Sequence, residues 1–160
     1  MPDTFVRATG DAVFRKRRFG LWLRQDHAPL DAPVIAGIAH FHLVEVHPFW
    51  DGNGRTARAL EALVLARHGF DFNRLLSPER QFAWDLKRYF EQIAATAGTS
   101  YEEGRDLTDW LEYFLLSLVV EIDAVSDWLA DFRRFMESFR EWVRPLGLTK
   151  RQVDLLGYIY

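Results

Sequence analysis

The sequence predicts an all-α fold. Three observations lead to this prediction. Apolar residues recur at helical spacing over long stretches, the alternation typical of strands is scarce, and Pro, Gly and Ser residues stand where such helices would begin or end. With 160 residues, of which 49% are apolar and 27% charged, the chain has the length and composition of one globular domain that can bury a core.

The N-terminal part has the least regular pattern. Residues 13–23 are the only place where we expect a short β-hairpin, although residues 18–23 also suit the start of a helix. The same part holds the one run of basic residues, at positions 15–18. This run is either a solvated segment or a contact for phosphates or for an acidic target.

Two helices are expected on either side of a glycine-containing turn. The apolar stretch of residues 33–46 suits a helix, and Pro48 ends it because proline cannot continue the hydrogen-bond ladder. Helical composition resumes at Arg55 and continues to Gly69, a residue type that commonly ends helices. The turn between them therefore lies at the N-terminus of the second helix.

The second half of the chain predicts further helices. Residues 77–79 read Ser-Pro-Glu, an N-cap followed by proline and an acidic first turn, and this helix should run to about residue 97. Apolar residues then recur at helical spacing over 110–143, with a break expected near Asp127. The aromatic residues of 128–142 exceed what a small core covers, so dimerisation or docking onto another domain is a hypothesis. Thr149 and Gln152 form a capping box that starts a last helix.

The turn carries the chemistry-bearing residues. His47 can be neutral near pH 7 and suits the role of general base. Asp51 is a hard oxygen ligand of the kind that Mg²⁺ bound to phosphates requires. The backbone of residues 52–55 lies at a helix N-terminus, where free N–H groups bind anions. Arg55 and Arg58 are three residues apart, so both can reach phosphates from the first turn.

These residues, HPFWDGNGRTAR at positions 47–58, resemble the central motif of the Fic family, with every specified position filled. Residues 39–46 resemble the helix before that motif, and residues 106–114 resemble the family's D-L-T-x-W stretch. Residues 148–156 look like the start of a winged-helix module found in some Fic proteins. The resemblance implies a Fic-like helical bundle divided into an N-terminal segment with a shortened flap region, a catalytic core, a helical extension and the start of a winged-helix-like segment, at residues 1–28, 29–126, 127–147 and 148–160.

The resemblance also implies an activity, protein adenylyltransfer: AMP moves from Mg-ATP to a Ser, Thr or Tyr hydroxyl of a target protein. In this reaction His47 is the base and Asp51 binds Mg²⁺. The phosphates are held by Gly52, Asn53, Gly54, Arg55 and Arg58, while Phe49 packs inward to hold the loop. Glycine at position 54, where relatives that phosphorylate their targets carry lysine, favours AMP transfer.

Alternatives remain open at this point. The chain could be a catalytically silent nucleotide-binding regulatory domain, or it could transfer or remove another phosphate-linked group. A third alternative is that it is a transcription-associated scaffold. His40 and His42 are expected to have no ligand role, because residues two apart point to different sides of a helix. Trp50 either edges the nucleotide pocket or is exposed.

Target docking and regulation are less clear from the sequence. Only about thirty residues precede the first motif helix, so the β-hairpin flap of the family is short, rewired or missing. Residues 99–104 match the family's inhibitory pattern [S/T]-x-x-x-E-[G/N], but at an unusual place. The inhibitor would otherwise be a separate antitoxin-like partner or sequence further towards the N-terminus. Expected partners are a protein substrate, an inhibitory protein and a second copy of the chain.

Composition excludes other classes. The chain has no cysteine, so disulfides and thiolate metal sites are excluded. A net charge of −3 gives no basic footprint for nucleic acid, and one helix cannot form a winged-helix module, so we expect no DNA binding by this chain. No apolar run is long enough to span a bilayer and no signal peptide is evident, so together with the use of ATP we expect a cytoplasmic protein.

Overall fold

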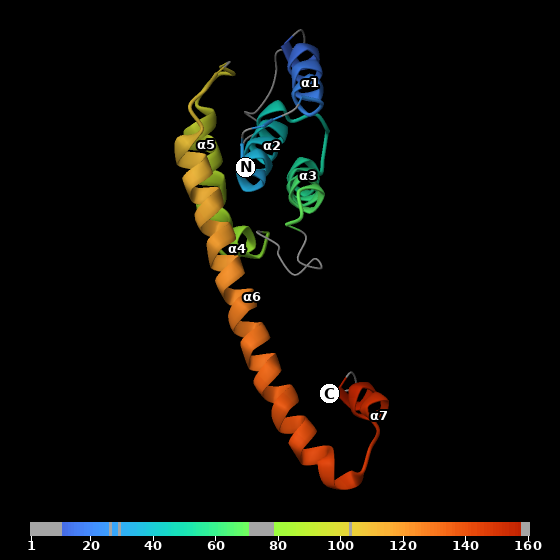
Figure 1. The fold of residues 1–160 in the computed structure, drawn as a ribbon. Helices are drawn as coiled ribbons and strands as arrows, with labels where there is room; N and C mark the ends of the chain where they lie inside the picture. The colour runs from blue at the N-terminus through green and yellow to red at the C-terminus, as the bar shows by residue number, and fades with distance from the viewer. Residues whose placement is uncertain (1–10, 26, 29, 71–78, 103, 158–160) are drawn as a thin grey trace. The chain divides into compact units, whose positions relative to one another are not determined.

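The computed structural model describes residues 11–157 except 26, 29, 71–78 and 103, and the regular elements among them are all helices (Figure 1). No strand occurs among these residues. The predicted all-α fold class is therefore confirmed. In chain order the elements are α1 (Asp11–Trp22), α2 (Ala32–Val46), α3 (Asn53–Arg67), α4 (Glu79–Trp84), α5 (Leu86–Ala97), α6 (Thr108–Val143), the 3₁₀ turn η2 (Arg144–Leu146) and α7 (Lys150–Gly157).

The expected hairpin over residues 13–23 is wrong, because this segment is helix α1. Long-chain residues such as the Arg and Lys of positions 15–18 are good helix formers, and a lone two-stranded hairpin is barely stable in water. One face of α1 packs on α2: the Phe19 and Trp22 rings lie 6.4 and 5.6 Å from the His42 ring. The chain thus has a helix where we expected the flap.

The helix expected from residue 77 to residue 97 is interrupted. Asp85 lies between α4 and α5 with a non-helical backbone (φ −130°, ψ 70°), and its Oδ1 accepts a hydrogen bond from the Arg88 N–H at 3.0 Å. Short polar side chains that bond to nearby backbone compete with the helix in this way. Asp85 therefore caps a new helix. The predicted cap at Ser77 and Pro78 lies outside the described residues.

The break expected near Asp127 is also wrong, since α6 is continuous from Thr108 to Val143. Sharp kinks need a proline, a glycine, a π-bulge or an inserted group, and residues 109–143 contain neither glycine nor proline. The residues nevertheless fall into two compact units, Met1–Glu121 and Ile122–Tyr160, so α6 contributes to both. The domain boundaries named above stay predictions.

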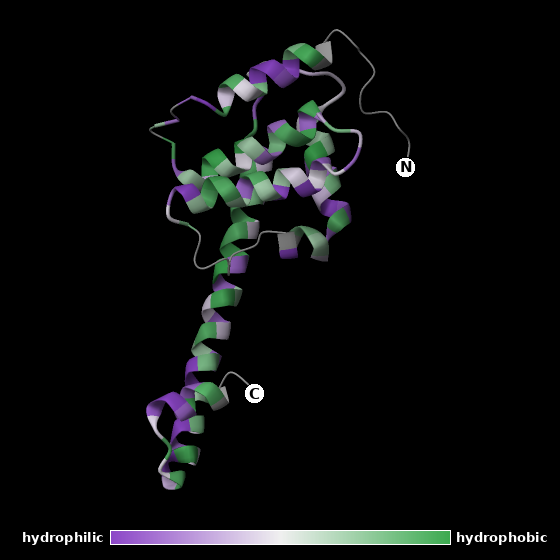
Figure 2. Cartoon of the chain, turned by 90° about the vertical axis from the view of Figure 1, so that its right-hand side faces the viewer, coloured by the Kyte–Doolittle hydropathy of each residue, from purple (hydrophilic) through white to green (hydrophobic). Residues whose placement is uncertain are grey.

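The core of the first unit is rich in aromatic residues. Its largest fully buried rings come from α2, α4, α5 and α6, namely Phe41, Phe82, Tyr89, Trp110 and Phe114. The Trp110 Nε1–H donates a hydrogen bond to the Gly37 carbonyl at 2.8 Å, which ties the start of α6 to the middle of α2. Hydrophobic residues recur along these helices, with hydrophilic residues between them (Figure 2). This packing holds α2, and with it the motif, in place.

The second unit consists of residues 122–143 of α6, then η2 and α7. The predicted capping box is confirmed: the Thr149 N–H donates to Gln152 Oε1 at 2.9 Å, and the Gln152 N–H donates to Thr149 Oγ1 at 3.4 Å. Whether this segment opens a winged-helix module stays a prediction. None of the described helices combines the length and apolar character needed to cross a membrane.

Candidate functional site

His47 ends α2 in an unusual conformation. Its φ of 48° and ψ of 58° are left-handed, and it is the one non-glycine residue with positive φ in the part of the chain that the structure describes. The backbone N–H still donates to the Leu43 carbonyl at 3.0 Å, which closes the last turn of α2. The exposed imidazole keeps its Nδ1 3.4 Å from the Val44 carbonyl. This turn directs the chain away from α2 into the loop before α3.

The loop is braced by Asn53. The Asn53 Oδ1 accepts a hydrogen bond from the Phe49 N–H at 2.9 Å, and its Nδ2 donates to the Phe49 carbonyl at 2.7 Å. Asn53 is buried, whereas the Phe49 side chain is half exposed. The expectation that Phe49 packs inward is therefore wrong, because the amide of Asn53 clasps the loop instead. Trp50 is fully exposed, which agrees with the second of the two alternatives predicted for it.

The first turn of α3 suits an anion. Gly52 is the N-cap, with a φ of 82° that favours glycine, and it offers no side chain to accept hydrogen bonds from the first turn. Backbone N–H groups at a helix start need acceptors, and phosphate oxygens supply them. A Cβ at Gly54 would lie 3.4 Å from Arg58 Nη1, so the absence of a side chain leaves the half-buried Arg58 room.

Asp51 and Arg55 are paired at the surface. Asp51 Oδ1 accepts from the Gly52 N–H at 2.6 Å, and Asp51 Oδ2 lies 3.0 Å from Arg55 Nη2. Their side chains are 85% and 74% exposed, and ion pairs this exposed contribute about 1 kcal/mol or less. Separating the pair therefore costs little free energy, and it makes the Asp51 carboxylate available to a cation and the Arg55 guanidinium available to a phosphate.

A buried polar network joins α2, α3 and α5. His40 hydrogen-bonds to Glu61 through Nδ1 and to the Tyr89 hydroxyl through Nε2, the latter at 2.9 Å. All three residues are almost fully buried and come from α2, α3 and α5. Burial raises the pKa of Tyr89 well above its usual range, although the positive charge of nearby Arg58 acts in the opposite direction. The network thus links the helices that carry His47 and Arg58.

Sequence reasoning missed this network. His40 was expected to have no ligand role; the structure assigns it a buried structural one. One signal in the sequence could have revealed it: Glu61 stands within an apolar stretch of the next helix, where a buried carboxylate needs a polar partner. His42, in contrast, lies 3.7 Å from Glu45 and against the aromatic rings of α1, away from Glu61.

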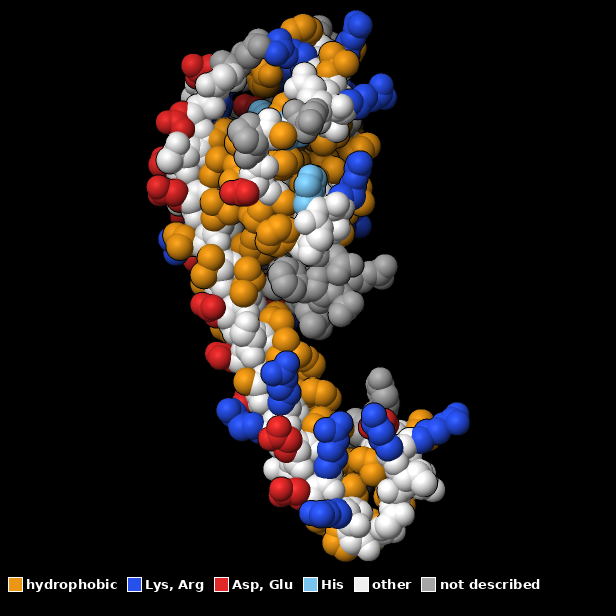
Figure 3. Space-filling view, in the orientation of Figure 1, with side chains coloured by type: hydrophobic (Ala, Val, Ile, Leu, Met, Phe, Trp, Pro, Cys, Tyr) orange, Lys and Arg blue, Asp and Glu red, His pale blue; other side chains and the backbone are white. Residues whose placement is uncertain are grey.

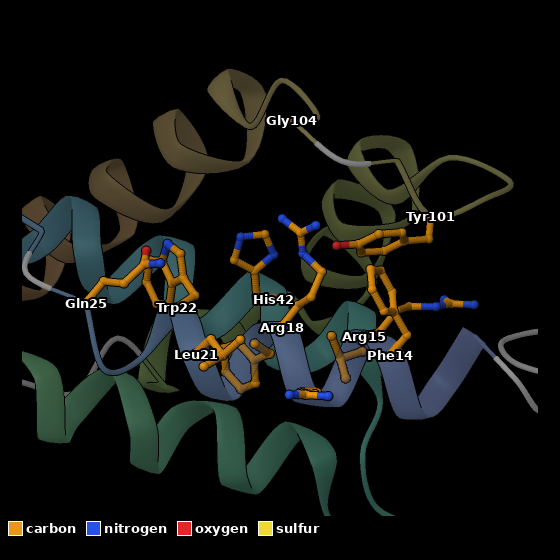
Figure 4. A pocket seen from close by; sticks show the side chains of 12 residues that line it. Phe14, Arg15, Arg18, Leu21, Trp22, Gln25, His42, Tyr101 and Gly104 are labelled. Atoms are coloured by element: carbon orange, nitrogen blue, oxygen red, sulfur yellow. The ribbon is translucent and has the colours of Figure 1, made fainter.

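The basic run lies beside the same end of α2. A cavity of about 660 Å³ is lined by α1, α2 and the segment around Tyr101 (Figure 4). Arg15, Arg17 and Arg18 line it together with Val46, the residue before His47. Arg15 also lies over the Tyr101 ring, 5.2 Å from its centre. The pattern at residues 99–104 includes position 103, which is outside the described residues.

The donor set fits Mg²⁺ carried by phosphates better than a metal held by protein alone. Among the described residues, no group of three or more His, Asp or Glu side chains could hold a metal ion. Mg²⁺ is commonly bound by one or two carboxylates together with substrate phosphates. Asp51 can supply one such carboxylate, next to the N-terminus of α3 and to Arg55.

Comparison with known proteins identifies the motif region. Residues 4–65 match the model of the Fic/DOC family. The proteins called "Protein adenylyltransferase Fic" of Drosophila sechellia, Drosophila simulans and Drosophila melanogaster are each 45% identical over 62 residues, which is 38% of this chain and 13% of theirs. The chain thus matches about an eighth of the length of these relatives. No solved structure matches it. The predicted resemblance to the Fic family is confirmed over this segment.

Proposed function

Residues 4–65 carry a Fic/DOC-family segment, and on this premise we propose that the chain is a protein adenylyltransferase. It would transfer AMP from Mg-ATP to a Ser, Thr or Tyr hydroxyl of a target protein. The observation that carries the proposal is the α2–α3 loop, where an exposed imidazole, a carboxylate, a helix N-terminus and two arginines meet within twelve residues. A cytoplasmic location, which the need for ATP favours, is part of the same proposal.

The phosphate end of the site would be formed by α3. Its first-turn N–H groups and Arg55 would bind α- and β-phosphate oxygens, and Arg58 the γ-phosphate, with bidentate contacts that lysine cannot make. Asp51 would hold Mg²⁺, which when bound offsets the charge of the phosphates. Gly52 and Gly54 let the backbone approach the nucleotide closely. Phosphoryl-type transfer depends chiefly on such positioning and charge stabilisation.

His47 would activate the target hydroxyl. Its Nδ1 faces the Val44 carbonyl, so a proton on Nδ1 leaves Nε2 as the free acceptor. The hydroxyl proton would pass to Nε2 as the hydroxyl oxygen forms a bond to the α-phosphorus. The bond from that phosphorus to the bridging oxygen breaks at the same step, and pyrophosphate leaves. General base catalysis of this kind contributes roughly 10²–10⁴-fold to the rate.

A second candidate is a nucleotide-binding regulatory domain without transferase activity. The observation that favours it is α1, which is a helix at the position where we expected a hairpin flap to hold the target backbone. A chain that binds the nucleotide but cannot position a hydroxyl would retain the phosphate contacts and lose transfer. The two candidates therefore differ in transfer and not in nucleotide binding.

The test compares two radiolabels on the same protein. The purified chain is incubated with Mg²⁺ and either α-labelled or γ-labelled ATP, with and without cell lysate, beside a His47→Ala variant. AMP transfer predicts protein-bound label from α-labelled ATP only, and its loss in the variant. Label from γ-labelled ATP would mean phosphate transfer. ATP binding by calorimetry without any label would favour the regulatory domain, and absence of binding would refute both candidates.

A further inference from the structure

The carboxylate of Glu61 is buried on the same face of α3 as Arg58. The two residues are three positions apart, a spacing that brings side chains together on a helix surface. Acidic side chains stand out at the surface of the chain (Figure 3), whereas Glu61 is only 1% exposed. Burial of a carboxylate is costly unless the group is paired and hydrogen-bonded. Specific partners must therefore hold Glu61 in place.

His40 and Tyr89 hold this carboxylate in one orientation. A carboxylate only accepts hydrogen bonds, so the His40 Nδ1–H donates to Glu61 Oε2. In the neutral imidazole Nε2 is then the acceptor, and the Tyr89 hydroxyl donates to it at 2.9 Å. Burial raises the pKa of Tyr89, so the hydroxyl keeps the proton that it donates. The hydrogen bonds thus run in one direction, from α5 through α2 to α3.

Arg58 connects this network with the first turn of α3. Its Nε is buried, and its positive charge acts on the Tyr89 hydroxyl together with the negative charge of Glu61. A Cβ at Gly54 would lie 3.4 Å from Arg58 Nη1, so the guanidinium also reaches the turn where phosphates would bind. A long side chain loses rotamer freedom when it binds a ligand, and groups that fix it beforehand strengthen binding.

We propose that Glu61, oriented by His40 and Tyr89, is a positioning residue that holds the Arg58 guanidinium where it binds the γ-phosphate. The inference rests on the proposed function for the assignment of the γ-phosphate to Arg58, and it requires nucleotide binding but not AMP transfer. Only a triphosphate carries a γ-phosphate, so the network would make the site selective for ATP over ADP. Glu61 acts through Arg58 and touches no substrate itself.

The test compares the affinities of the full chain for Mg-ATP and for Mg-ADP, each measured by calorimetry. The unmodified chain should bind ATP more tightly, and Arg58→Ala should remove this preference. Glu61→Gln keeps the shape of the side chain and an acceptor for His40 but removes the charge. It should lower the ratio of ATP affinity to ADP affinity by about tenfold, the effect of losing one charge-assisted hydrogen bond. Tyr89→Phe, the milder change, should lower the ratio by about threefold, as loss of a neutral hydrogen bond does.

Glu121→Gln is the matched control. Glu121 is as buried as Glu61, but it belongs to α6 and its Oε1 lies 3.4 Å from Arg80 Nη2. This variant should leave the ratio unchanged even if it lowers the stability of the chain. In a chain that already carries Arg58→Ala, Glu61→Gln should change the ratio no further, because its effect passes through Arg58.

A merely structural role gives a different result, since ATP and ADP affinities would fall together. An unchanged or raised ratio in either Glu61→Gln or Tyr89→Phe would overturn the proposal, and so would a further fall in the absence of Arg58. Failure of the proposed transferase is recognised separately, by the absence of transfer from α-labelled ATP. A chain that transfers no AMP but shows the expected ratios would keep the positioning role, and a chain that binds no nucleotide would refute both.

Discussion

His47 holds a conformation that histidine does not favour. For a residue with a Cβ, a left-handed backbone costs about 1–2 kcal/mol, and glycine is the usual residue at such a helix end. The strained backbone is thus that of the proposed general base itself. Strained positions are frequent at functional sites, because selection for chemistry overrides the local preference.

This leads to a prediction with two variants. His47→Ala removes the imidazole and keeps the strain, whereas His47→Gly removes both. We expect neither variant to transfer AMP, and we expect the Gly variant to be more stable than the Ala variant by about 1 kcal/mol, because relief of the strain exceeds the added chain entropy of glycine. Chemical denaturation of the two variants measures the difference. Equal stability would show that the left-handed turn is not strained.

Asn53 braces the loop, since its side-chain amide makes two hydrogen bonds to the Phe49 backbone. Asn53→Asp keeps the acceptor and loses the donor, and it places a negative charge at the start of α3 where phosphates would bind. We expect the variant to stay folded, with a loss of about 1–3 kcal/mol, and to bind Mg-ATP much more weakly. Calorimetric titration with Mg-ATP measures the affinity of this variant beside those of the unmodified chain and of Asp51→Asn. An unchanged affinity for Mg-ATP would show that Asn53 does not contribute to nucleotide binding.

The residues of the α2–α3 loop could be predicted from the sequence because they lie within twelve positions of one another. Local spacing decides which of them meet at one helix end. The network of His40, Glu61 and Tyr89 could not be predicted in this way, since its hydrogen bonds join residues 21 and 49 positions apart. Only the packing of α2, α3 and α5 brings these side chains together.

At the level of helices, α2 and α6 approach closely at Gly37. A Cβ at this position would lie 2.9 Å from Leu111 Cδ2 and 3.0 Å from the Phe114 ring, and the Gly37 carbonyl accepts the Trp110 hydrogen bond. This hydrogen bond gives Trp110, the tryptophan of the D-L-T-x-W stretch, a structural role between α2 and α6. Asp106 accepts two hydrogen bonds from Thr108 at the start of α6, which lowers the pKa of Asp106, and Trp110 then anchors the helix to α2.

The close approach predicts opposite effects for two glycines. Gly37→Ala gains up to about 1 kcal/mol of helix propensity, but overpacking against the buried Phe114 costs about 1–3 kcal/mol, so we expect a net loss of stability. Gly20→Ala on α1 meets nothing within 4 Å and should be neutral or stabilising. Thermal unfolding of both variants measures the difference. A stabilised Gly37→Ala variant would show that the two helices can move apart without loss.

The bounds of α2 and α3, to within two residues, and the start of α7 follow from proline, glycine and capping residues that act locally, and they could be predicted. Three other elements were predicted wrongly. The helix at α1 depends on its packing against His42, the end of α4 depends on the cap formed by Asp85, and the continuity of α6 depends on there being no glycine or proline to interrupt it. The first of these depends on tertiary contact; the other two were misread signals in the sequence.

At the level of the whole molecule, the chain divides into two units. The motif, the buried network and the basic cavity all belong to Met1–Glu121, while Ile122–Tyr160 contains the rest of α6 with η2 and α7. The proposed chemistry thus uses residues of one unit only. If so, a ligand of the first unit should stabilise that unit and leave the second unchanged, since a ligand stabilises only the structure that must form to bind it.

Hydrogen exchange of the full chain with and without Mg-ATP tests this division. At a nucleotide concentration about one hundred times the Kd, binding should add about 2.7 kcal/mol to the stability of the unit that binds. We expect slower exchange at the end of α2 and along α3, and unchanged exchange in residues 122–143. Arg58→Ala should abolish the protection, whereas Phe132→Glu should leave it intact. Protection that extends through residues 122–143, or that Phe132→Glu removes, would show that nucleotide binding is coupled to the second unit and that the two units do not act separately.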